Sequence, residues 1–208
     1  MKKFEYVSKK EYMPVKKELI ELINMVQNEA RDSFTFRYDF IGSASRNMIT
    51  REVNGNKGYD FDVNIRVNDD DENYSAKEIR DILKRAFDKY SYLFSYDYAE
   101  DSSRVITIKV KDKKNARILH SCDFAVVYDC MNGKQQYIRY NKNQNKYIWE
   151  YQPDSFYRLE EKIKWIKDNG LWQEVRNKYL SNKENNSDSN KKSRSIFAET
   201  VAQVYNEN

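Results

Sequence analysis

The sequence predicts an α+β protein with a mixed, mostly antiparallel sheet, helices on one face of that sheet and a helical C-terminal extension. Apolar and polar residues alternate in segments such as 60–67 and 118–128, which is typical of half-buried strands. Segments 13–31 and 75–90 instead place apolar residues at three- and four-residue steps, as amphipathic helices do. After Pro153 the pattern is helical. Strands and helices therefore coexist, and the last part of the chain is all helix.

The composition indicates a chain with a small apolar core and a mixed surface. Of its 208 residues, 39% are hydrophobic, the mean hydropathy is -0.98, and 17 residues are tyrosines. The 37 basic and 33 acidic side chains give a net charge of +4. Such a balanced surface has no basic block of the kind that marks a nucleic-acid-binding protein. The length is enough for one domain with an extension.

Cysteine and histidine usage excludes several classes of protein. Two cysteines, Cys122 and Cys130, form neither a disulfide framework nor a zinc pattern, and the single histidine, His120, excludes a histidine-rich metal cluster. No apolar run approaches the length of a membrane span, and no secretory signal pattern precedes the first helix. We therefore expect a soluble, cytoplasmic protein that has no membrane partner.

The N-terminal part is predicted as helix, strand, turn and strand. The helix 13–31 has Pro14 in its first turn, where the missing N–H costs no hydrogen bond. Aromatic and β-branched residues predict a strand over 35–41. Segment 44–58 is polar and is predicted as a short helix followed by a loop. The strand 60–67 follows.

The middle of the chain continues with a well-marked helix and more strands. Ser75 and Glu78 form a capping box at the start of that helix. Segments 104–110 and 118–128 are predicted as an antiparallel pair, because only a lysine-rich turn separates them. Segment 131–149 is predicted as a hairpin with its tip near 143–145.

The C-terminal part is predicted as three helices, over 155–169, 171–180 and 195–205. The segment of about 181–193 is polar and is predicted to be a mobile loop. We accordingly divide the chain into a catalytic domain, 1–152, and a helical segment, 153–208.

Two aspartates on the strand 60–67 are the strongest candidate for chemistry. Successive side chains of a strand point to opposite faces, so Asp60, Asp62 and Asn64 share one face. Two carboxylates side by side repel each other unless a cation or a proton lies between them. The opposite face is apolar and carries Phe61, Val63, Ile65 and Val67. One face therefore serves the core, and the other is predicted to bind a divalent metal ion.

These residues resemble a known pattern. Gly42-Ser43 after a strand, Asp60-x-Asp62 on the next strand, and Asp123 inside a later apolar strand are together similar to the motifs of the polymerase-beta-type nucleotidyltransferase superfamily. The resemblance covers about 35–128. It implies the fold of that superfamily and is compatible with a minimal bacterial member, distantly similar to cyclic-oligonucleotide and oligoadenylate synthases.

The resemblance implies a metal-dependent enzyme that uses nucleoside triphosphates, ATP among them. It assigns Asp60, Asp62 and Asp123 as the catalytic residues that bind Mg²⁺ or Mn²⁺. Phosphoryl transfer of this kind uses two divalent ions roughly 3.5–4 Å apart, and Mg²⁺ prefers carboxylate oxygens. The reaction would move a nucleoside monophosphate to a hydroxyl and release pyrophosphate. The acceptor, a small molecule, an RNA end or a protein, stays open.

The nucleotide-binding candidates are Gly42, Ser43, Arg46 and Lys57. A glycine turn lets a phosphate approach the backbone closely, and the two cations could contact phosphate oxygens. The alternatives are an ordinary strand-to-helix turn with Ser43 as N-cap and two solvated surface charges.

Several other residues have simpler interpretations. Asp123 could be an exposed edge-strand aspartate, Cys122 an inert core residue and His120 a strand-entry residue. The acidic run 69–72 is predicted to be a solvated turn. The aromatic cluster within 137–151 is predicted to fill the hairpin, although some members could stack on a nucleobase.

Two other functions stay open at this point. The chain could be an inactive module that has the same fold and binds nucleotide or nucleic acid. It could also be a toxin–antitoxin-type nucleotidyltransferase that acts on tRNA or protein.

Overall fold

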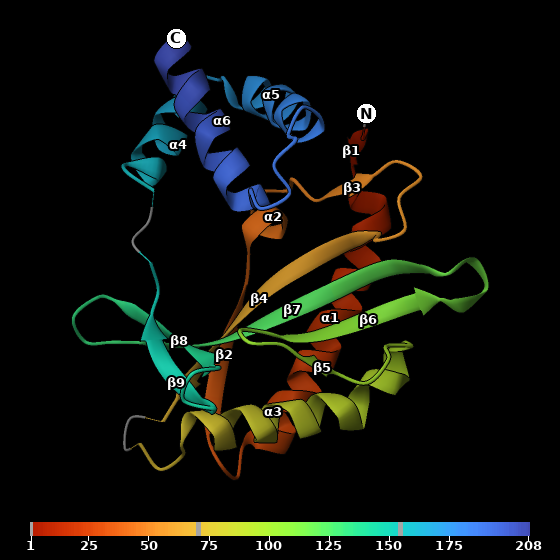
Figure 1. The fold of residues 1–208 in the computed structure, drawn as a ribbon, viewed down its shortest axis with the longest axis vertical. Coiled ribbons are helices and arrows are strands. Elements are labelled where there is room, and N and C mark those ends of the chain that lie inside the picture. The colour runs from red at the N-terminus through yellow and green to blue at the C-terminus, as the bar shows by residue number, and fades with distance from the viewer. Residues whose placement is uncertain (1, 70–71, 154–155) are drawn as a thin grey trace. The chain divides into compact units, whose positions relative to one another are not determined.

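The computed structural model describes residues 2–69, 72–153 and 156–208. The chain forms two compact units, which are coloured along the sequence in Figure 1. We call them the sheet unit, made of Val7–Ile49 and Gly55–Gln152, and the helical unit, made of Met1–Tyr6, Thr50–Asn54 and Pro153–Asn208.

The sheet unit is built on a seven-stranded sheet with the order β2-β4-β7-β6-β5, in which β7 also pairs with β8 and β8 with β9. The strands are β2 (Thr35–Ile41), β4 (Tyr59–Asn68), β5 (Glu100–Asp101), β6 (Ile106–Asp112), β7 (Arg117–Asp129), β8 (Gln135–Asn141) and β9 (Lys146–Tyr151). Among the strand pairs described for this sheet, β4 and β7 alone run parallel, and the other pairs are antiparallel. The predicted α+β class with a mixed, mostly antiparallel sheet is confirmed.

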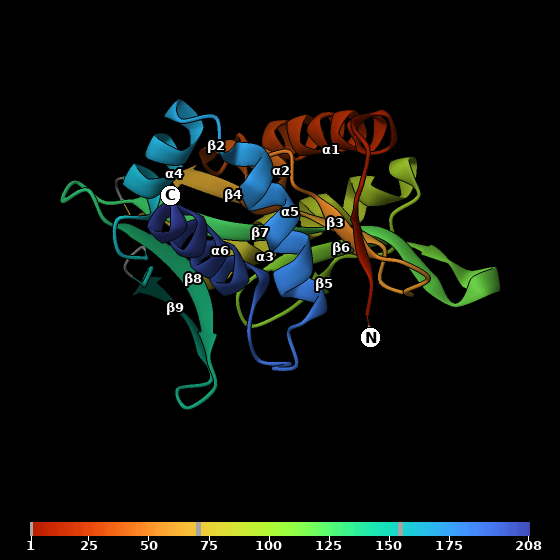
Figure 2. The same ribbon diagram turned by 90° about the horizontal axis from the view of Figure 1, so that it is seen from above.

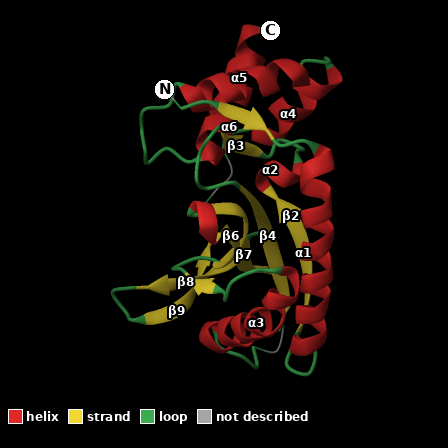
Figure 3. Cartoon of the chain, turned by 90° about the vertical axis from the view of Figure 1, so that its right-hand side faces the viewer, coloured by secondary structure: helices red, strands yellow, loops and turns green. Residues whose placement is uncertain are grey.

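Two long helices, α1 (Lys9–Ala30) and α3 (Ala76–Tyr90), pack on the apolar face of this sheet (Figure 3). Phe87 of α3 stacks on Phe124 of β7 with ring centroids 4.2 Å apart. The same cluster includes Phe61 and Ile65 of β4, both fully buried. This face is the one that strand alternation predicts to be apolar.

The capping box at the start of α3 is confirmed. The Ser75 hydroxyl accepts from the Glu78 backbone N–H, and the Glu78 carboxylate accepts from the Ser75 backbone N–H. Two N–H groups that lack intrahelical partners are satisfied in this way.

The start of α1 differs from the prediction. The helix begins at Lys9 with Ser8 as N-cap, so Pro14 lies inside it rather than in its first turn. A proline there removes one intrahelical hydrogen bond. The helix tolerates it because its apolar stripe, which includes Leu19, Leu22 and Val26, is fully buried in the core.

Three short elements complete the sheet unit. They are α2 (Gly42–Ser45) and the 3₁₀ turns η1 (Ser91–Phe94) and η2 (Lys113–Asn115). The β8–β9 hairpin has its turn between Asn141 and Lys146, as predicted.

The helical unit contains α4 (Leu159–Asp168), α5 (Trp172–Glu184) and α6 (Ser193–Glu207), and α6 packs against both other helices (Figure 2). Phe197 of α6 meets Trp172 and Tyr179 of α5 edge to face. The first of these helices was predicted to begin at residue 155, which lies outside the described residues, and α4 begins only at Leu159. Helix α5 continues past Leu180 to Glu184.

The sequence did not predict the two-stranded sheet of the helical unit, in which β1 (Phe4–Tyr6) pairs with β3 (Thr50–Glu52). Each strand has three residues, which is too short to show a period. In the part of the chain that the structure describes, no helix is long and apolar enough to cross a membrane.

Candidate active site

Asp60 and Asp62 lie on the β4 face opposite the core. Along Tyr59–Asn68 the odd-numbered residues are buried, while Asp60 is exposed and Asp62 is half-buried. Asn64, on the same face, is 8% exposed. The expected alternation therefore holds, and the carboxylates lie away from the apolar cluster.

The parallel pairing of β4 with β7 brings Asp123 to this face. Asp62 is paired with Asp123, and Asp60 with Ser121. Strand β7 has β4 on one side and β6 on the other, so Asp123 does not lie on an edge strand. The edge-strand interpretation of Asp123 is thus wrong.

A hydrogen bond orients Asp123. The Thr107 hydroxyl of β6 donates to Asp123 Oδ1 at 2.6 Å. Thr107 is the register partner of Asp123, and the sequence did not mark it as a residue of the site. The only sequence signal for Thr107 would be the register of the predicted strand pair 104–110 and 118–128. The bulge between Val110 and Lys111 shifts that register.

The carboxylates share one electrostatic field. Burial first, and then the negative charges of Asp60 and Asp123, raise the pKa of Asp62 to about 7, against the opposing charge of Arg46. Burial also raises the pKa of Asp123, against the Thr107 hydrogen bond and the charge of Lys109. Ionising all the carboxylates is therefore costly unless a cation joins them.

Gly42 lies directly against Asp62. Its φ is +62°, in the left-handed region, and a Cβ added to it would be 2.6 Å from Asp62 Oδ2. Only glycine fits both constraints. The backbone after β2 can thus approach the carboxylate face more closely than it could if position 42 carried a side chain.

Ser43 and Arg46 belong to the same turn. The N-cap of α2 is Ile41, so Ser43 is not the N-cap, contrary to one of the two interpretations. The Ser43 carbonyl accepts from the backbone N–H groups of Arg46 and Met48, at 3.3 and 2.9 Å. The charge of Arg46 acts on Asp62, which places this cation at the site.

Lys57 lies in a different place. It lines a hollow of about 290 Å³ with Lys111, Lys113 and Arg117, next to the β6–β7 turn. The structure therefore brings Gly42 and the charge of Arg46 to Asp62, and it places Lys57 in a basic hollow of its own.

The oxygen donors of Asp60, Asp62 and Asp123 suit a hard divalent cation such as Mg²⁺ or Mn²⁺. Among the described residues, no three His, Cys, Asp or Glu side chains stand in an arrangement ready to hold a metal ion. The backbone register does bring the three aspartates together, and their repulsion is the kind that a cation relieves. We conclude that the donor set fits, and that binding would need the carboxylates to turn toward one another.

Two further residues have structural roles. Cys122 is fully buried, and burial raises the pKa of its thiol well above the usual value. His120 lies against the rings of Tyr59 and Tyr96, and burial lowers its pKa to about 4. Both therefore stay uncharged at neutral pH.

Comparisons with known proteins support the fold. No protein-family model matches the sequence, and no curated protein does. Among solved structures, the GTP-bound form of DncV from Vibrio cholerae is similar, with a TM-score of 0.57 and 14% identity over 92% of this chain and 51% of that one. The cyclic AMP-GMP synthase DncV in complex with nonhydrolyzable GTP has a TM-score of 0.59 and 14% identity, over 92% of this chain and 52% of that one.

The 3′-deoxy ATP-bound form of DncV gives a TM-score of 0.56 at 15% identity. This chain spans about half the length of these structures. The likeness shows that the chain has the nucleotidyltransferase-type fold.

Proposed function

We propose that this chain is a metal-dependent nucleotidyltransferase that uses a nucleoside triphosphate. The observation that carries the proposal is the register of β4 and β7, which pairs Asp62 with Asp123 and leaves Asp60 on the same face. The fold shared with the GTP-bound structures of DncV supports it. In the proposed reaction an acceptor hydroxyl gives up its proton to solvent and its oxygen forms a bond to the α-phosphorus. The bond from that phosphorus to the β-phosphate oxygen breaks, and pyrophosphate leaves.

Asp60, Asp62 and Asp123 would hold the divalent ions. When bound, such ions lower the pKa of an attacking hydroxyl and neutralise the charge of the leaving pyrophosphate. Thr107 would keep Asp123 oriented through its 2.6 Å hydrogen bond. Asp62 must be ionised to act as a ligand, and its raised pKa makes that ionisation depend on the cation.

The turn that follows β2 would receive the triphosphate. Gly42 lets the backbone come against the carboxylate face, and the Ser43 hydroxyl makes no hydrogen bond to another described residue. Arg46 supplies a positive charge next to Asp62. We assign these three residues to phosphate binding. Lys57 lies in its separate hollow. We propose that it contacts a part of the nucleotide or of the acceptor that lies away from the carboxylates.

The acceptor is proposed to be a hydroxyl, and nucleotides are the first acceptors to test. DncV is a cyclic AMP-GMP synthase, but this chain spans about half of its length. ATP and GTP should therefore be supplied separately and together, so that a nucleotide acceptor can be distinguished from another hydroxyl.

The experiment is pyrophosphate release from each NTP with Mg²⁺ or Mn²⁺, compared with a chelator. We expect release that requires the ion and that Asp62→Asn and Asp123→Asn reduce to background. Asp32→Asn, which makes the same chemical change at an exposed turn, is the control and should act as wild type.

Two results would argue against the enzyme. If no NTP releases pyrophosphate and none binds in a metal-dependent way, the proposal is wrong. If NTP binds with the ion but no pyrophosphate forms with any acceptor, the chain is a nucleotide-binding module with the same fold.

A further inference from the structure

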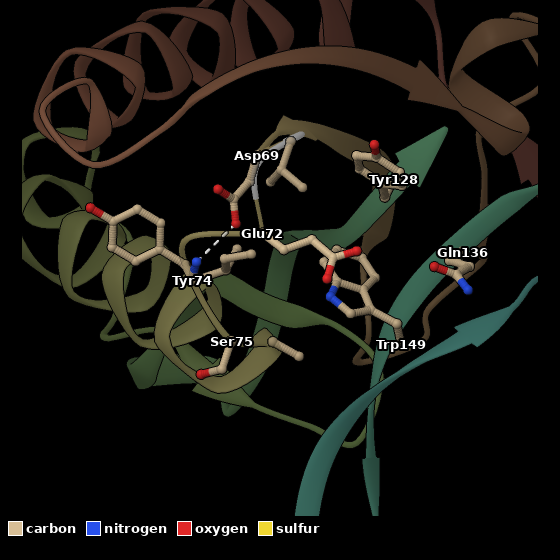
Figure 4. A pocket seen from close by; sticks show the side chains of 10 residues that line it. Asp69, Glu72, Tyr74, Ser75, Tyr128, Gln136 and Trp149 are labelled. Carbon is tan, nitrogen blue, oxygen red and sulfur yellow. Dashed lines mark hydrogen bonds between the residues drawn. The ribbon is translucent and has the colours of Figure 1, made fainter. Parts of the chain in front are cut away.

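A second hollow, of about 370 Å³, is shown from close by in Figure 4. It lies near the end of β4 that is opposite to Asp60 and Asp62, because Val67 and Asp69 line it. Val67 lines it, and Val67 belongs to the core face of β4, so the sheet separates this hollow from the carboxylate face. Its volume is within the range of small-molecule sites, roughly 300–1,000 Å³. The residues that matter most in its lining are Asp69, Glu72, Tyr74, Tyr128, Gln136 and Trp149.

Two aromatic rings form one side of the hollow. Tyr128 of β7 and Trp149 of β9 meet edge to face, with centroids 6.2 Å apart and planes at 61°. Both are partly buried and pack against the apolar core, which fixes their positions. Ring faces held at an angle offer two surfaces of negative potential to one ligand.

Two carboxylates form the other side, and among the residues that the structure describes no Lys, Arg or His side chain lines the hollow. Asp69 is held in place because its two oxygens accept the backbone N–H groups of Asn73 and Tyr74, at 3.1 and 3.0 Å. The Glu72 carboxylate makes no hydrogen bond or ion pair with another described residue, whereas the Glu72 backbone N–H donates to the Asp69 carbonyl at 3.0 Å. The acidic turn was predicted to be merely solvated; Asp70 and Asp71 lie outside the described residues, whereas Asp69 and Glu72 line the hollow.

An anion is a poor match for this hollow, even though the N-terminus of α3 is close. The N–H groups of Ser75 and Glu78 are used by the capping box, and those of Asn73 and Tyr74 by Asp69. A bound anion would find few donors and would face two carboxylates.

We propose that this hollow binds a small organic cation. The charged nitrogen lies near the carboxylates of Asp69 and Glu72, and the apolar part of the ligand packs on Trp149 and Tyr128. Aromatic rings and carboxylates together favour an alkylated ammonium or a planar nitrogen cation, because such ions are weakly hydrated and interact with ring faces. The Gln136 amide can accept or donate one further hydrogen bond.

The test is calorimetric titration of the full chain with benzyltrimethylammonium as the cation, benzyl alcohol as a neutral molecule and benzoate as an anion of similar size. We expect saturable binding of the cation alone. Glu72→Gln should weaken it roughly tenfold, since it removes one charge from an exposed turn. Glu21→Gln, the same change on the exposed side of α1, is the matched control and should leave binding unchanged.

Trp149→Leu should abolish binding. The thermal unfolding of this variant should be measured as well, because Trp149 packs on the core. If that variant does not fold, Glu72→Gln decides alone. Benzoate or benzyl alcohol binding as tightly as the cation, no saturable binding of the cation, or equal binding by wild type and Glu72→Gln would each overturn the proposal.

Discussion

The two faces of β4 differ in burial and in charge. On one face Phe61, Val63 and Ile65 are almost completely buried. On the other, Asp60 is exposed and Asp62 is half-buried with a pKa raised to about 7. The first face stabilises the fold, and the second costs stability as long as no cation is bound.

Consecutive residues of β4 alternate between side chains that stabilise the fold and side chains that serve the proposed function. Apolar burial contributes about 1.5–3 kcal/mol for each large side chain, whereas clustered carboxylates repel each other. Substitutions on the two faces should therefore have opposite effects on stability.

Phe61→Ala should have the largest effect. Phe61 is fully buried and meets the rings of Tyr12, Phe40 and Tyr59 edge to face. We expect a loss of about 3–5 kcal/mol in the free energy of unfolding, measured by urea denaturation. Tyr92→Ala, at a site that is 70% exposed, should change it by less than about 0.5 kcal/mol. Similar losses in the two variants would break the contrast between buried and exposed rings.

Gly42→Ala tests the contact between the turn and the carboxylate face. A left-handed φ costs roughly 1–2 kcal/mol for a residue with a Cβ, and the new Cβ would displace the Asp62 carboxylate. Gly133→Ala is a matched control, because Gly133 has φ +74° with nothing within 4 Å.

Both glycine variants should lose similar stability, and only Gly42→Ala should also lose metal-dependent NTP binding. Unchanged binding in Gly42→Ala would show that the position of Asp62 is unimportant.

Thr107→Val tests the support of Asp123. Removing the hydroxyl that donates to Asp123 should weaken metal affinity by about 10–100-fold, the usual range for a residue that orients a ligand. Mn²⁺ binding, followed by electron paramagnetic resonance, measures this directly. Thr107→Ser keeps the hydroxyl and should restore most of the affinity; equal affinity of Val and Ser variants would exclude an orienting role.

Asp62→Asn should give the smallest change, and of opposite sign to Phe61→Ala. The pKa of Asp62 in the folded state, about 7, lies above the ordinary aspartate value of 3.8. Between these values the native state holds a proton that the unfolded state has lost, so wild-type stability falls as pH rises.

Asp62→Asn cannot ionise at this position, so its stability should not fall in this way as the pH rises. In the presence of EDTA its thermal midpoint should exceed that of wild type, more at pH 8 than at pH 5.5. Mg²⁺ should reduce the difference by stabilising wild type. A variant that is less stable than wild type at pH 8 would contradict the repulsion.

Much of the fold could be predicted because local rules determine it. The bounds of β2, the alternation of β4 and the Ser75–Glu78 box depend on residues that are close in sequence. The start of α1 could not be predicted, because tertiary burial of its apolar stripe outweighs the unfavourable position of Pro14.

Contacts between distant segments were missed. Arg80 of α3 is fully buried because its guanidinium donates to Asp101 at 2.7 Å and to the carbonyls of Ser102 and Val105. A charged residue on a helix gives no sequence signal of such burial.

The candidate site divides in the same way. Alternation along one strand was sufficient to place Asp60 and Asp62 on a common face, because that geometry is a property of the local backbone. Strand pairing is not local, and only the tertiary structure paired Asp62 with Asp123, set Gly42 against Asp62 Oδ2 and placed Lys57 in another hollow. The sequence by itself determined which residues carry charge and which face they share. The pairing of β4 with β7 decided which charges meet, since hydrogen bonds between distant strands fix that register.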